Sequence, residues 1–250
     1  MAKHYKEKQK KTIMQKMNNL MLIVFIILFI ISTKKIIEWC VNNKKNKRIQ
    51  EELSERIVIS EEKELKIDFQ ALKQKNPDTV GWIKVEGTEI EHVVVKANDN
   101  NYYLTRNFEK EYNTSGWIFA DYTNKIDGTD KNLVIYGHNV RDNSMFGTLK
   151  NILEEEWYNN EQNYKIKFIT EKENAIYEVF SIYKIEAEDY YIQTEFETEA
   201  SFEEFVKTIK KRSIKDFNKE ITAEDKILTL STCADNNKYR VVLHGRKVMN

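Results

Sequence analysis

The longest apolar run in the chain lies near its N-terminus, where LMLIVFIILFII occupies residues 20–31 and no charge occurs from Met17 to Thr33. As a helix, this uncharged stretch would extend about 25 Å, just enough to cross the hydrocarbon core of a bilayer. Lysines are frequent before the run, and no small-residue cleavage motif follows it. The pattern therefore predicts a short tail and an uncleaved transmembrane signal anchor over residues 1–33.

The charges around this anchor do not decide its orientation. Six basic residues precede the apolar run, and six more lie between residues 34 and 48, so the usual excess of positive charge on the cytoplasmic side is nearly cancelled. Residues 34–65 are dense in charge, contain no glycine or proline, and have too few apolar positions for a core. They predict a charged helical stalk.

From about residue 66 the pattern changes to short apolar or alternating segments with turns between them. Such segments, spaced this way, are typical of an antiparallel barrel or sandwich. The pattern thus predicts a mainly β domain over residues 66–250. The expected strands lie in 81–97 (a hairpin around a Gly-Thr turn), 117–122, 132–139, 164–170, 175–187, 226–233 and 240–248.

Two helices are expected among these strands. In residues 201–213 the apolar positions recur at helical spacing, so one face should lie on the sheet; they are Phe202, Phe205, Val206 and Ile209. Ser201 and Glu204 have the spacing of a capping box at the start of this helix. An earlier helix is expected over residues 68–76, where Pro77 ends it.

Composition narrows the classes of function. The 41% of hydrophobic residues supports a buried core in a domain of ordinary size. Forty basic residues balance forty acidic ones, and no basic stripe alternates with aromatic residues, so we expect no nucleic-acid partner. Cysteines and histidines lack the spacing of a zinc site, and we expect neither a metal nor another cofactor.

Cys233 ends the apolar run KILTLSTC and is followed by a polar turn and by Arg240. A hairpin that turns at Asn236 and Asn237 would set Cys233 directly opposite Arg240. Opposed residues have Cβ atoms about 4.5–5.5 Å apart, so the guanidinium would reach an oxygen of a group bonded to the sulfur. Taken alone, however, a single cysteine on a strand is more often an inert buried thiol.

His138 favours the catalytic interpretation. It ends the run LVIYG at a glycine turn, and the end of a strand at a barrel rim is a common place for catalytic groups. A thiol, with an ordinary pKa near 8.5, needs help to become a thiolate, and an imidazole can favour that form and later protonate a leaving amine. Arg240 would hold the substrate carbonyl or its oxyanion.

The same hairpin register places the second C-terminal arginine, Arg246, away from Cys233, His138 and Arg240. It places Arg246 opposite Ile227, about 20 Å farther along the strand, beyond the reach of a carbonyl on the Cys233 sulfur. The second cysteine, Cys40, lies at the predicted membrane edge, where a small interfacial hydrophobe is expected and a disulfide to Cys233 is not.

These motifs together resemble the sortase family, the membrane-anchored cysteine transpeptidases of Gram-positive surfaces. The segment TLSTC with an arginine seven residues later, and the upstream YGHN, carry the resemblance, and residues 76–108, 116–124 and 132–151 resemble class B members in particular. The resemblance covers about residues 66–250. It implies a sortase β-barrel of eight strands with N-terminal helices and one late helix packed on the barrel.

The sequence departs from the class B pattern at two places. EHVVV lacks the proline that usually precedes the paired valines, and Trp117 replaces a smaller residue. Neither departure touches the motifs of the catalytic set. By motif position, the resemblance implies His138 as the family histidine, Cys233 as the nucleophile and Arg240 as the arginine. It also implies substrate-groove positions at Asn100, Leu104, Ser231 and Thr232. Tyr190 and Tyr191 fit either this groove or, as we expect, aromatic packing.

The family reaction implies the partners and the location. Cys233 would attack the threonine carbonyl of a C-terminal sorting signal, NPxTx-like for class B, and an amine of a peptidoglycan precursor or of a pilin lysine would resolve the thioester. Because sorted surface proteins and the wall are outside the cell, the resemblance implies a single-pass membrane protein. Its N-terminus would be cytoplasmic and its catalytic domain, residues 66–250, extracellular.

Other classes of protein are less consistent with the sequence. A papain-like peptidase places its cysteine before its histidine, and an L,D-transpeptidase has a His-Gly-Cys style motif; this chain has neither arrangement. A plain cysteine peptidase and a non-catalytic, membrane-anchored wall-binding module remain the alternatives. The binding module would tolerate the loss of the Cys233 thiol.

Overall fold

The computed structural model of the chain describes residues 2–59, 65–233 and 238–248. Contacts divide the chain into two compact units, Met1–Lys44 and Lys45–Asn250. The described residues of the first unit all belong to the helix α1 (Ala2–Ser54). The last turns of this helix and all other helices and strands belong to the second unit.

The helix α1 (Ala2–Ser54) runs without interruption through a segment that contains neither glycine nor proline. All the side chains of the apolar run 20–31 are exposed. From Met14 onward the helix is long and apolar enough to cross a membrane by length and composition. One N-terminal helix is therefore a candidate membrane span, as the hydropathy pattern predicts.

The last turns of α1 belong to the second unit and pack into it. Ile49 and Leu53 are buried and join the main hydrophobic core. The side-chain amide of Asn46 donates to the Gly116 carbonyl oxygen at 3.2 Å. We expected too few apolar positions here for a core. A narrow helical face formed by Asn46, Ile49 and Leu53 is enough to pack against the core, because the buried Asn46 amide is satisfied by its hydrogen bond. A count of apolar residues along the segment does not detect such a face.

Short elements follow α1. A two-stranded sheet pairs β1 (Ile57–Ile59) with β2 (Leu65–Ile67). The helix α2 (Phe69–Lys75) is capped by the Asp68 side chain and ends just before Pro77, as predicted. The other short helical segments are η1 (Tyr102–Leu104), η2 (Gly147–Leu153), α3 (Glu155–Tyr158), η3 (Glu161–Asn163) and η4 (Tyr190–Ile192).

Eight strands close into a barrel in which hydrogen-bonded neighbours follow the order β10-β8-β7-β3-β4-β5-β6-β9. This closure confirms the eight-stranded barrel and excludes a sandwich. The strands are β3 (Thr79–Val85), β4 (Glu91–Val95), β5 (Phe119–Ala120), β6 (Asn132–His138), β7 (Lys165–Ile169), β8 (Asn174–Glu186), β9 (Ile227–Cys233) and β10 (Tyr239–Val248).

The barrel is mixed, so the expectation of an antiparallel barrel is wrong at two places. The strand β4 pairs with β5 in parallel, and β6 pairs with β9 in parallel over seven residue pairs. Parallel neighbours require long crossover connections, and here the chain between β6 and β9 includes β7, β8 and the late helix. Local alternation indicates where strands lie but not which distant strands pair.

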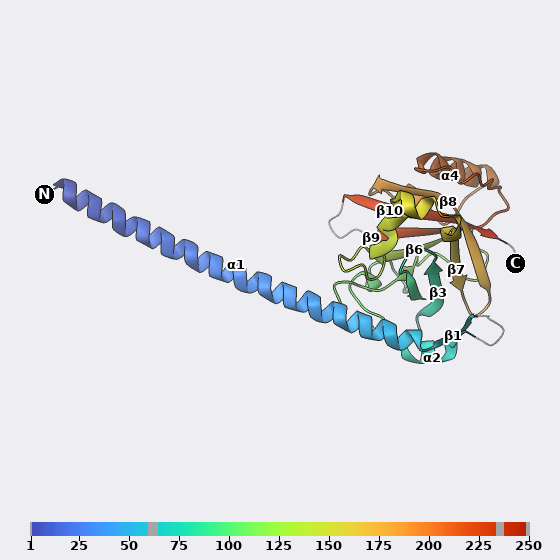
Figure 1. The fold of residues 1–250 in the computed structure, drawn as a ribbon, viewed down its shortest axis with the longest axis horizontal. Coiled ribbons are helices and arrows are strands. Elements are labelled where there is room, and N and C mark those ends of the chain that lie inside the picture. The colour runs from blue at the N-terminus through green and yellow to red at the C-terminus, as the bar shows by residue number, and fades with distance from the viewer. Residues whose placement is uncertain (1, 60–64, 234–237, 249–250) are drawn as a thin grey trace. The chain divides into compact units, whose positions relative to one another are not determined.

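The late helix α4 (Glu199–Arg212) covers β8 (Figure 1). Its four predicted apolar positions are buried in a second hydrophobic cluster that also includes Val242 of β10, which confirms the predicted face. The predicted cap is three residues too late. The Thr198 side chain accepts from the Ser201 backbone N–H at 3.1 Å and forms the capping box with Ser201. Threonine and serine are both favoured N-cap residues, and in the structure the N-cap is Thr198, with Ser201 at the third helical position.

The two departures from the class B pattern lie side by side. Trp117 is fully buried, and its indole N–H donates to the Val93 carbonyl oxygen at 2.9 Å. His92 precedes the valines, and its ring lies 6.2 Å from that of Trp117. The His92 Nδ1 is 2.8 Å from the side-chain oxygen of Gln50 on α1. The replacement side chains thus connect the sheet to the last turns of the long helix.

Two histidines are buried inside the fold and held there as neutral rings. Burial lowers the pKa of His92 to about 4, although a hydrogen bond to the Met145 backbone partly opposes this. Burial, with the positive charge of Arg212, lowers the pKa of His244 to about 3. The His244 ring nitrogens lie 2.8 Å from the hydroxyls of Tyr183 and Thr229, so both nitrogens have partners without a positive charge.

We predict that the free energy of unfolding falls as the pH drops below about 6.5. In the unfolded chain both histidines take up protons near their ordinary pKa of about 6.5, whereas the folded rings stay neutral down to about pH 4 and 3. Each buried histidine therefore contributes a loss of at most about 1.4 kcal/mol per pH unit below 6.5 and nothing above it.

Urea unfolding of the second unit at pH 7.5, 6 and 5 checks this dependence, with the full chain in detergent. His244→Gln should keep the hydrogen-bonding capacity and reduce the slope between pH 6 and 5. A slope that is the same in this variant and in wild type would contradict the assignment.

Candidate active site

The predicted catalytic histidine and cysteine are neighbours across two paired strands. The parallel register of β6 and β9 runs from Asn132 opposite Ile227 to His138 opposite Cys233. Neighbouring strands lie about 4.8 Å apart, so the two backbones are adjacent at the same end of the barrel. The Cys233 side chain lies outside the described part of the structure, which describes its backbone as the last residue of β9.

The ring of His138 is held in a fixed orientation. His138 is buried, and its Nε2 lies 2.7 Å from the Leu104 carbonyl oxygen, to which it donates. Gly116, with a φ of +58°, lies against this ring. A Cβ at that position would lie 2.4 Å from the Tyr103 carbonyl oxygen and 3.0 Å from the His138 ring. Only glycine combines this backbone conformation with such a close approach.

The strands β9 and β10 pair in the register that the hairpin interpretation predicts. The paired residues extend from Ile227 opposite Arg246 to Ser231 opposite Val242, which confirms the predicted position of Arg246. Beyond the last of these pairs, the Val241 backbone N–H donates to the Thr232 hydroxyl at 3.0 Å. The expected turn at residues 236 and 237 lies outside the described residues.

Arg240 lies one residue beyond that contact. Continued by two residues past the last pair, the same register sets Arg240 opposite Cys233. On its other side, Arg240 is paired with Ile185 of β8. Its guanidinium donates to the Tyr239 carbonyl oxygen at 3.1 Å. The arginine thus belongs to the barrel end where His138 and Cys233 meet.

A groove of about 470 Å³ opens at this end, and all four residues that the resemblance assigns to substrate binding line it together with Arg240. Asn100 precedes η1 and Leu104 is its last residue, and Ser231 and Thr232 lie on β9. Sequence reasoning missed several further wall residues, among them Phe119 and Tyr136. Tyr136 precedes His138 by two residues on β6 and so shares its face, a signal that the strand pattern already contained.

The structure shows which of Tyr190 and Tyr191, both on η4, lines the groove and which only packs against other aromatic rings. Tyr191 lines the groove, is almost fully buried, and packs edge-on against Tyr183. Its hydroxyl lies 3.0 Å from that of Ser231. Tyr190 is 36% exposed and stacks on Phe205 of α4. Tyr191 therefore serves both packing and the groove, whereas Tyr190 serves packing.

Asp121 lies behind the groove and orients two of its residues. The buried carboxylate accepts from the Asn100 side-chain N–H and from the Tyr136 hydroxyl, both at 2.8 Å. The Asn100 side-chain oxygen accepts from the Tyr122 backbone N–H at 3.0 Å. These contacts fix which end of the Asn100 amide faces which partner. Within the described ranges no acceptor binds the second side-chain N–H of Asn100, so it is available to a ligand in the groove.

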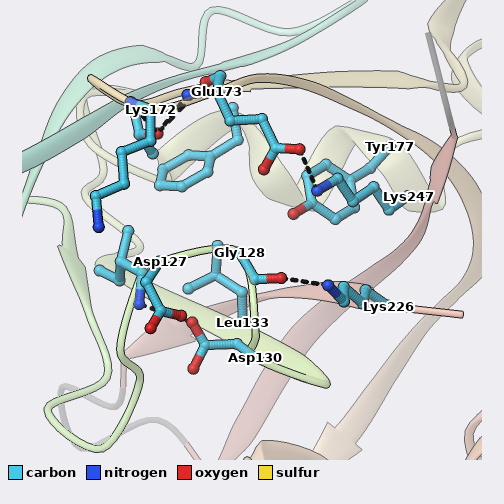
Figure 2. Close-up of a pocket in the computed structure, with 12 residues that line it drawn as sticks. Asp127, Gly128, Asp130, Leu133, Lys172, Glu173, Tyr177, Lys226 and Lys247 are labelled. Carbon is cyan, nitrogen blue, oxygen red and sulfur yellow. Dashed lines mark hydrogen bonds and ion pairs between the residues drawn. The ribbon is translucent and has the colours of Figure 1, made fainter.

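A different cavity, of about 320 Å³, contains none of the predicted site residues. Figure 2 shows its charged lining, in which Lys247 pairs with Glu173 and Lys226 donates to the Gly128 carbonyl oxygen. These groups satisfy one another, and we assign no function to the cavity. Among the described residues, no group of three histidine, cysteine, aspartate or glutamate side chains is arranged to hold a metal ion.

Comparison with known proteins agrees with this architecture. A family model described as a sortase domain matches residues 83–248. Sortase B of Staphylococcus aureus (strain NCTC 8325 / PS 47) is 32% identical over 209 residues, which are 82% of this chain and 85% of that protein. Sortase B of Listeria monocytogenes serovar 1/2a (strain ATCC BAA-679 / EGD-e) is 35% identical over 188 residues, which are 74% of this chain and 76% of that protein.

Solved structures extend the similarity to the fold. The crystal structure of sortase B from B. anthracis in complex with AAEK1 superposes with a TM-score of 0.75 at 34% identity, covering 84% of this chain and 99% of that one. Clostridium perfringens sortase B gives a TM-score of 0.68 at 35% identity, covering 73% and 100%. By fold and by domain, the chain belongs to the sortase family of cysteine transpeptidases. Within this family, its similarity over most of its length is to class B members.

We predict that Asp121→Ala lowers the free energy of unfolding by about 1–3 kcal/mol, because the half-buried Asn100 amide and the buried Tyr136 hydroxyl lose their acceptor. Asp189→Ala is the matched control, since Asp189 lines the same groove but is exposed and caps η4 without a side-chain hydrogen bond. It should change the unfolding free energy by less than about 0.5 kcal/mol. Urea titration of the full chain in detergent measures both, and equal effects would contradict the role of Asp121.

Proposed function

We propose that this chain is a class B sortase that cleaves an NPxTx-like C-terminal sorting signal after threonine and joins the surface protein to an amine of a peptidoglycan precursor or of a pilin. The observation that most supports this proposal is the parallel register that makes His138 and Cys233 neighbours at the ends of β6 and β9. Family membership supports the class of reaction, and the groove beside these residues supports an extended peptide substrate.

In the first half of the proposed reaction, the Cys233 thiolate attacks the threonine carbonyl carbon. The carbonyl oxygen becomes an oxyanion, which the Arg240 guanidinium stabilises. The peptide bond after threonine then breaks, and His138 as imidazolium gives its proton to the departing amine. The product is a thioester between Cys233 and the surface protein. Because Nε2 of His138 is engaged by the Leu104 carbonyl, Nδ1 is the ring nitrogen that exchanges this proton.

In the second half, a neutral acceptor amine attacks the thioester carbonyl and forms the new amide bond. His138 takes the proton of the attacking amine, the carbon–sulfur bond breaks, and the Cys233 thiolate is restored. Arg240 holds the carbonyl oxygen again. The proposed reaction uses no metal or other cofactor in either half.

The groove has both apolar and polar walls for such a signal. Its walls include the aromatic rings of Phe119 and Tyr191, and its polar groups include amides and hydroxyls that can pair with the backbone of an extended peptide, beside the charged groups of Glu188, Asp189 and Arg240. The remaining N–H of Asn100 is a donor for a substrate carbonyl oxygen. We assign the first four residues of the signal to this groove.

The proposed reaction also fixes the orientation in the membrane. Sorted proteins and wall precursors are substrates outside the cell, so residues 66–250 would be extracellular and residues 34–65 a stalk. Residues 1–33 would be the cytoplasmic tail and signal anchor. Protease protection in intact cells tests this arrangement, because an extracellular domain is digested from outside and a cytoplasmic one is not.

A panel of fluorogenic peptides that begin NP, LP or SP tests the proposed function. With the full chain in detergent, the NPxTx peptide should be cleaved after threonine, and added triglycine should produce a transfer product visible by mass spectrometry. Hydrolysis with no transfer product at any acceptor concentration would indicate a plain cysteine peptidase. Binding of wall material without cleavage would indicate the non-catalytic module.

We predict that Cys233→Ala and His138→Ala each abolish transfer, because one removes the nucleophile and the other the acid and base. Cys40→Ser should stay within about twofold of wild type, because Cys40 is a free, exposed cysteine on α1 and surface changes of this kind are usually near neutral. The rate of product formation under saturating peptide checks all three. Comparable loss in Cys40→Ser would require a role for a second thiol.

The two C-terminal arginines should behave differently. Arg240→Ala should lower kcat/KM about a hundredfold or more, the range for loss of one oxyanion donor. Arg240→Lys should recover only part, because an ammonium cannot reproduce the guanidinium fork. Arg246→Ala should stay within a few-fold, since Arg246 is paired with Ile227 and donates to the Glu220 carbonyl oxygen at 3.1 Å, far along β10. The reverse ranking in peptide cleavage would overturn the role of Arg240.

A further inference from the structure

The last turns of α1 carry two polar side chains, Asn46 and Gln50, that do not line the substrate groove. Asn46 is buried and Gln50 is half-buried. Both belong to the second unit of the chain. Each makes hydrogen bonds to a segment that leads to His138, and we call this pair of residues the α1 brace.

Asn46 fixes the loop that ends at Gly116. Its side-chain N–H donates to the Gly116 carbonyl oxygen at 3.2 Å, and its side-chain oxygen accepts from the Asn113 side-chain N–H at 2.8 Å. The Gly116 backbone N–H donates in turn to the Asn113 carbonyl oxygen at 3.0 Å. Both ends of this short loop are therefore tied to one side chain of α1.

This loop contacts the His138 ring and also the segment that holds it. Gly116 lies against the ring, so closely that a Cβ there would be 3.0 Å from it. The next residue, Trp117, donates its backbone N–H to the Tyr103 carbonyl oxygen at 3.0 Å. Tyr103 precedes Leu104, whose carbonyl oxygen accepts from Nε2 of His138. A shift of the loop would therefore move both a contact and the hydrogen-bond acceptor of the ring.

Gln50 leads to the same histidine through β4. Its side-chain N–H donates to the Glu91 carbonyl oxygen at 2.6 Å, and its side-chain oxygen lies 2.8 Å from Nδ1 of His92. The His92 ring also forms a hydrogen bond with the Met145 backbone. His92 therefore connects α1 to the segment that follows β6.

That segment returns to the backbone of His138. Met145 is buried, has a φ of +53° and forms an isolated antiparallel bridge with Asn139, the residue after His138. The next backbone N–H, that of Phe146, donates to the His138 carbonyl oxygen at 3.0 Å. The α1 brace thus reaches the ring of His138 through Gly116 and its backbone through Met145.

The connection through Gln50 departs from the class B pattern. His92 stands where class B sequences usually have a proline, and a proline has no ring nitrogen free to bind Gln50 or the Met145 backbone. Trp117, the other departure, packs beside His92 with the two rings 6.2 Å apart. This connection is therefore a property of this chain and does not follow from the class.

Packing of the helix on the barrel does not require polar residues at these two positions. Ile49 and Leu53, on the same turns, are buried in the main hydrophobic core and supply the apolar contact. A buried amide contributes little net stability even when its partners are present, whereas a satisfied polar network specifies one geometry. The observed contacts therefore indicate that Asn46 and Gln50 position the segments around His138.

We propose that Asn46 and Gln50 are positioning residues of the transpeptidation, which hold the ring of His138 in the orientation that proton transfer requires. The helix that contains the candidate membrane span thus also supports the active site with its last turns. This inference rests on the proposed function and adds two residues of α1 to it. Because neither residue lines the groove, their loss should change the rate of the chemical steps and leave the binding of the peptide unchanged.

Asn46→Leu and Gln50→Met test the proposal with the full chain in detergent and the NPxTx peptide. Each substitution roughly keeps the side-chain volume and removes the hydrogen bonds. Each should lower kcat about three- to thirtyfold and leave KM within about twofold of wild type, because a small misplacement of a reacting group costs rate. Hydrolysis and transfer to triglycine should both slow, since His138 serves both halves of the reaction.

Ile49→Val is the matched control, because Ile49 is a buried apolar residue on the same turns of α1. It should lower the urea midpoint of unfolding and leave kcat unchanged. Gln50→Glu is the conservative variant, which keeps an acceptor oxygen for His92 and should have a higher kcat than Gln50→Met. Near-UV circular dichroism at the assay temperature checks that each variant is folded. If Asn46→Leu does not fold, Gln50→Met provides the same test at a half-buried position.

A spectroscopic test does not depend on catalysis. The chain has four histidines, so selective 15N-histidine labelling gives four ring spectra, and His138→Ala identifies the one that belongs to His138. At pH 8 this ring should be the Nε2–H tautomer in wild type, since Nε2 donates to the Leu104 carbonyl oxygen at 2.7 Å. Its signals should shift in Asn46→Leu and Gln50→Met and stay in place in Ile49→Val.

An unchanged kcat in the folded brace variants, or a His138 signal that does not move in them, would overturn the proposal. A fall of kcat in Ile49→Val as large as that in the brace variants would also overturn it, because any weakening of the helix contact would then lower the rate. Failure of the proposed function gives a different result, since wild type would then not cleave the NPxTx peptide. The His138 signal would in that case decide by itself whether the brace holds the ring.

Discussion

The arrangement of the candidate site depends on one interaction, the parallel ladder between β6 and β9. Every residue of β6 is buried, so the ladder lies within the protein and cannot shift without moving the core. Gly137 shows how tightly this region is packed, because a Cβ there would lie 2.4 Å from the Ile118 side chain and 2.6 Å from that of Phe146. A ladder fixed in this way fixes the neighbours at its end, His138 and Cys233.

A buried polar layer supports the wall of the groove lined by Tyr191 and Ser231. The Thr229 hydroxyl donates to the side-chain oxygen of Asn132 at 2.7 Å and contacts the His244 ring. The Asn132 side-chain N–H then donates to the Gln193 carbonyl oxygen at 2.8 Å, just after η4. The wall is therefore tied to the strands by satisfied hydrogen bonds, which give a unique geometry that apolar contacts alone would not specify.

The end of the long helix is connected to the histidine through one loop. Asn46 donates to the carbonyl oxygen of Gly116 and accepts from the side-chain N–H of Asn113 at 2.8 Å. Gly116 in turn lies against the His138 ring. The residues of α1 that precede the barrel therefore support the loop behind the His138 ring.

Sequence alone determined the features that are local. The apolar run of residues 20–31, the face of α4 and the β9–β10 register follow from periodicity within a segment or across one short turn, where few alternatives compete. The sequence also contained the motif resemblance that selected His138, Cys233 and Arg240. Only the tertiary structure decided which distant strands pair, because a parallel neighbour leaves no mark in the alternation of either strand. The role of Asp121 likewise depends on the tertiary structure, because its partners Asn100 and Tyr136 come from other segments of the chain.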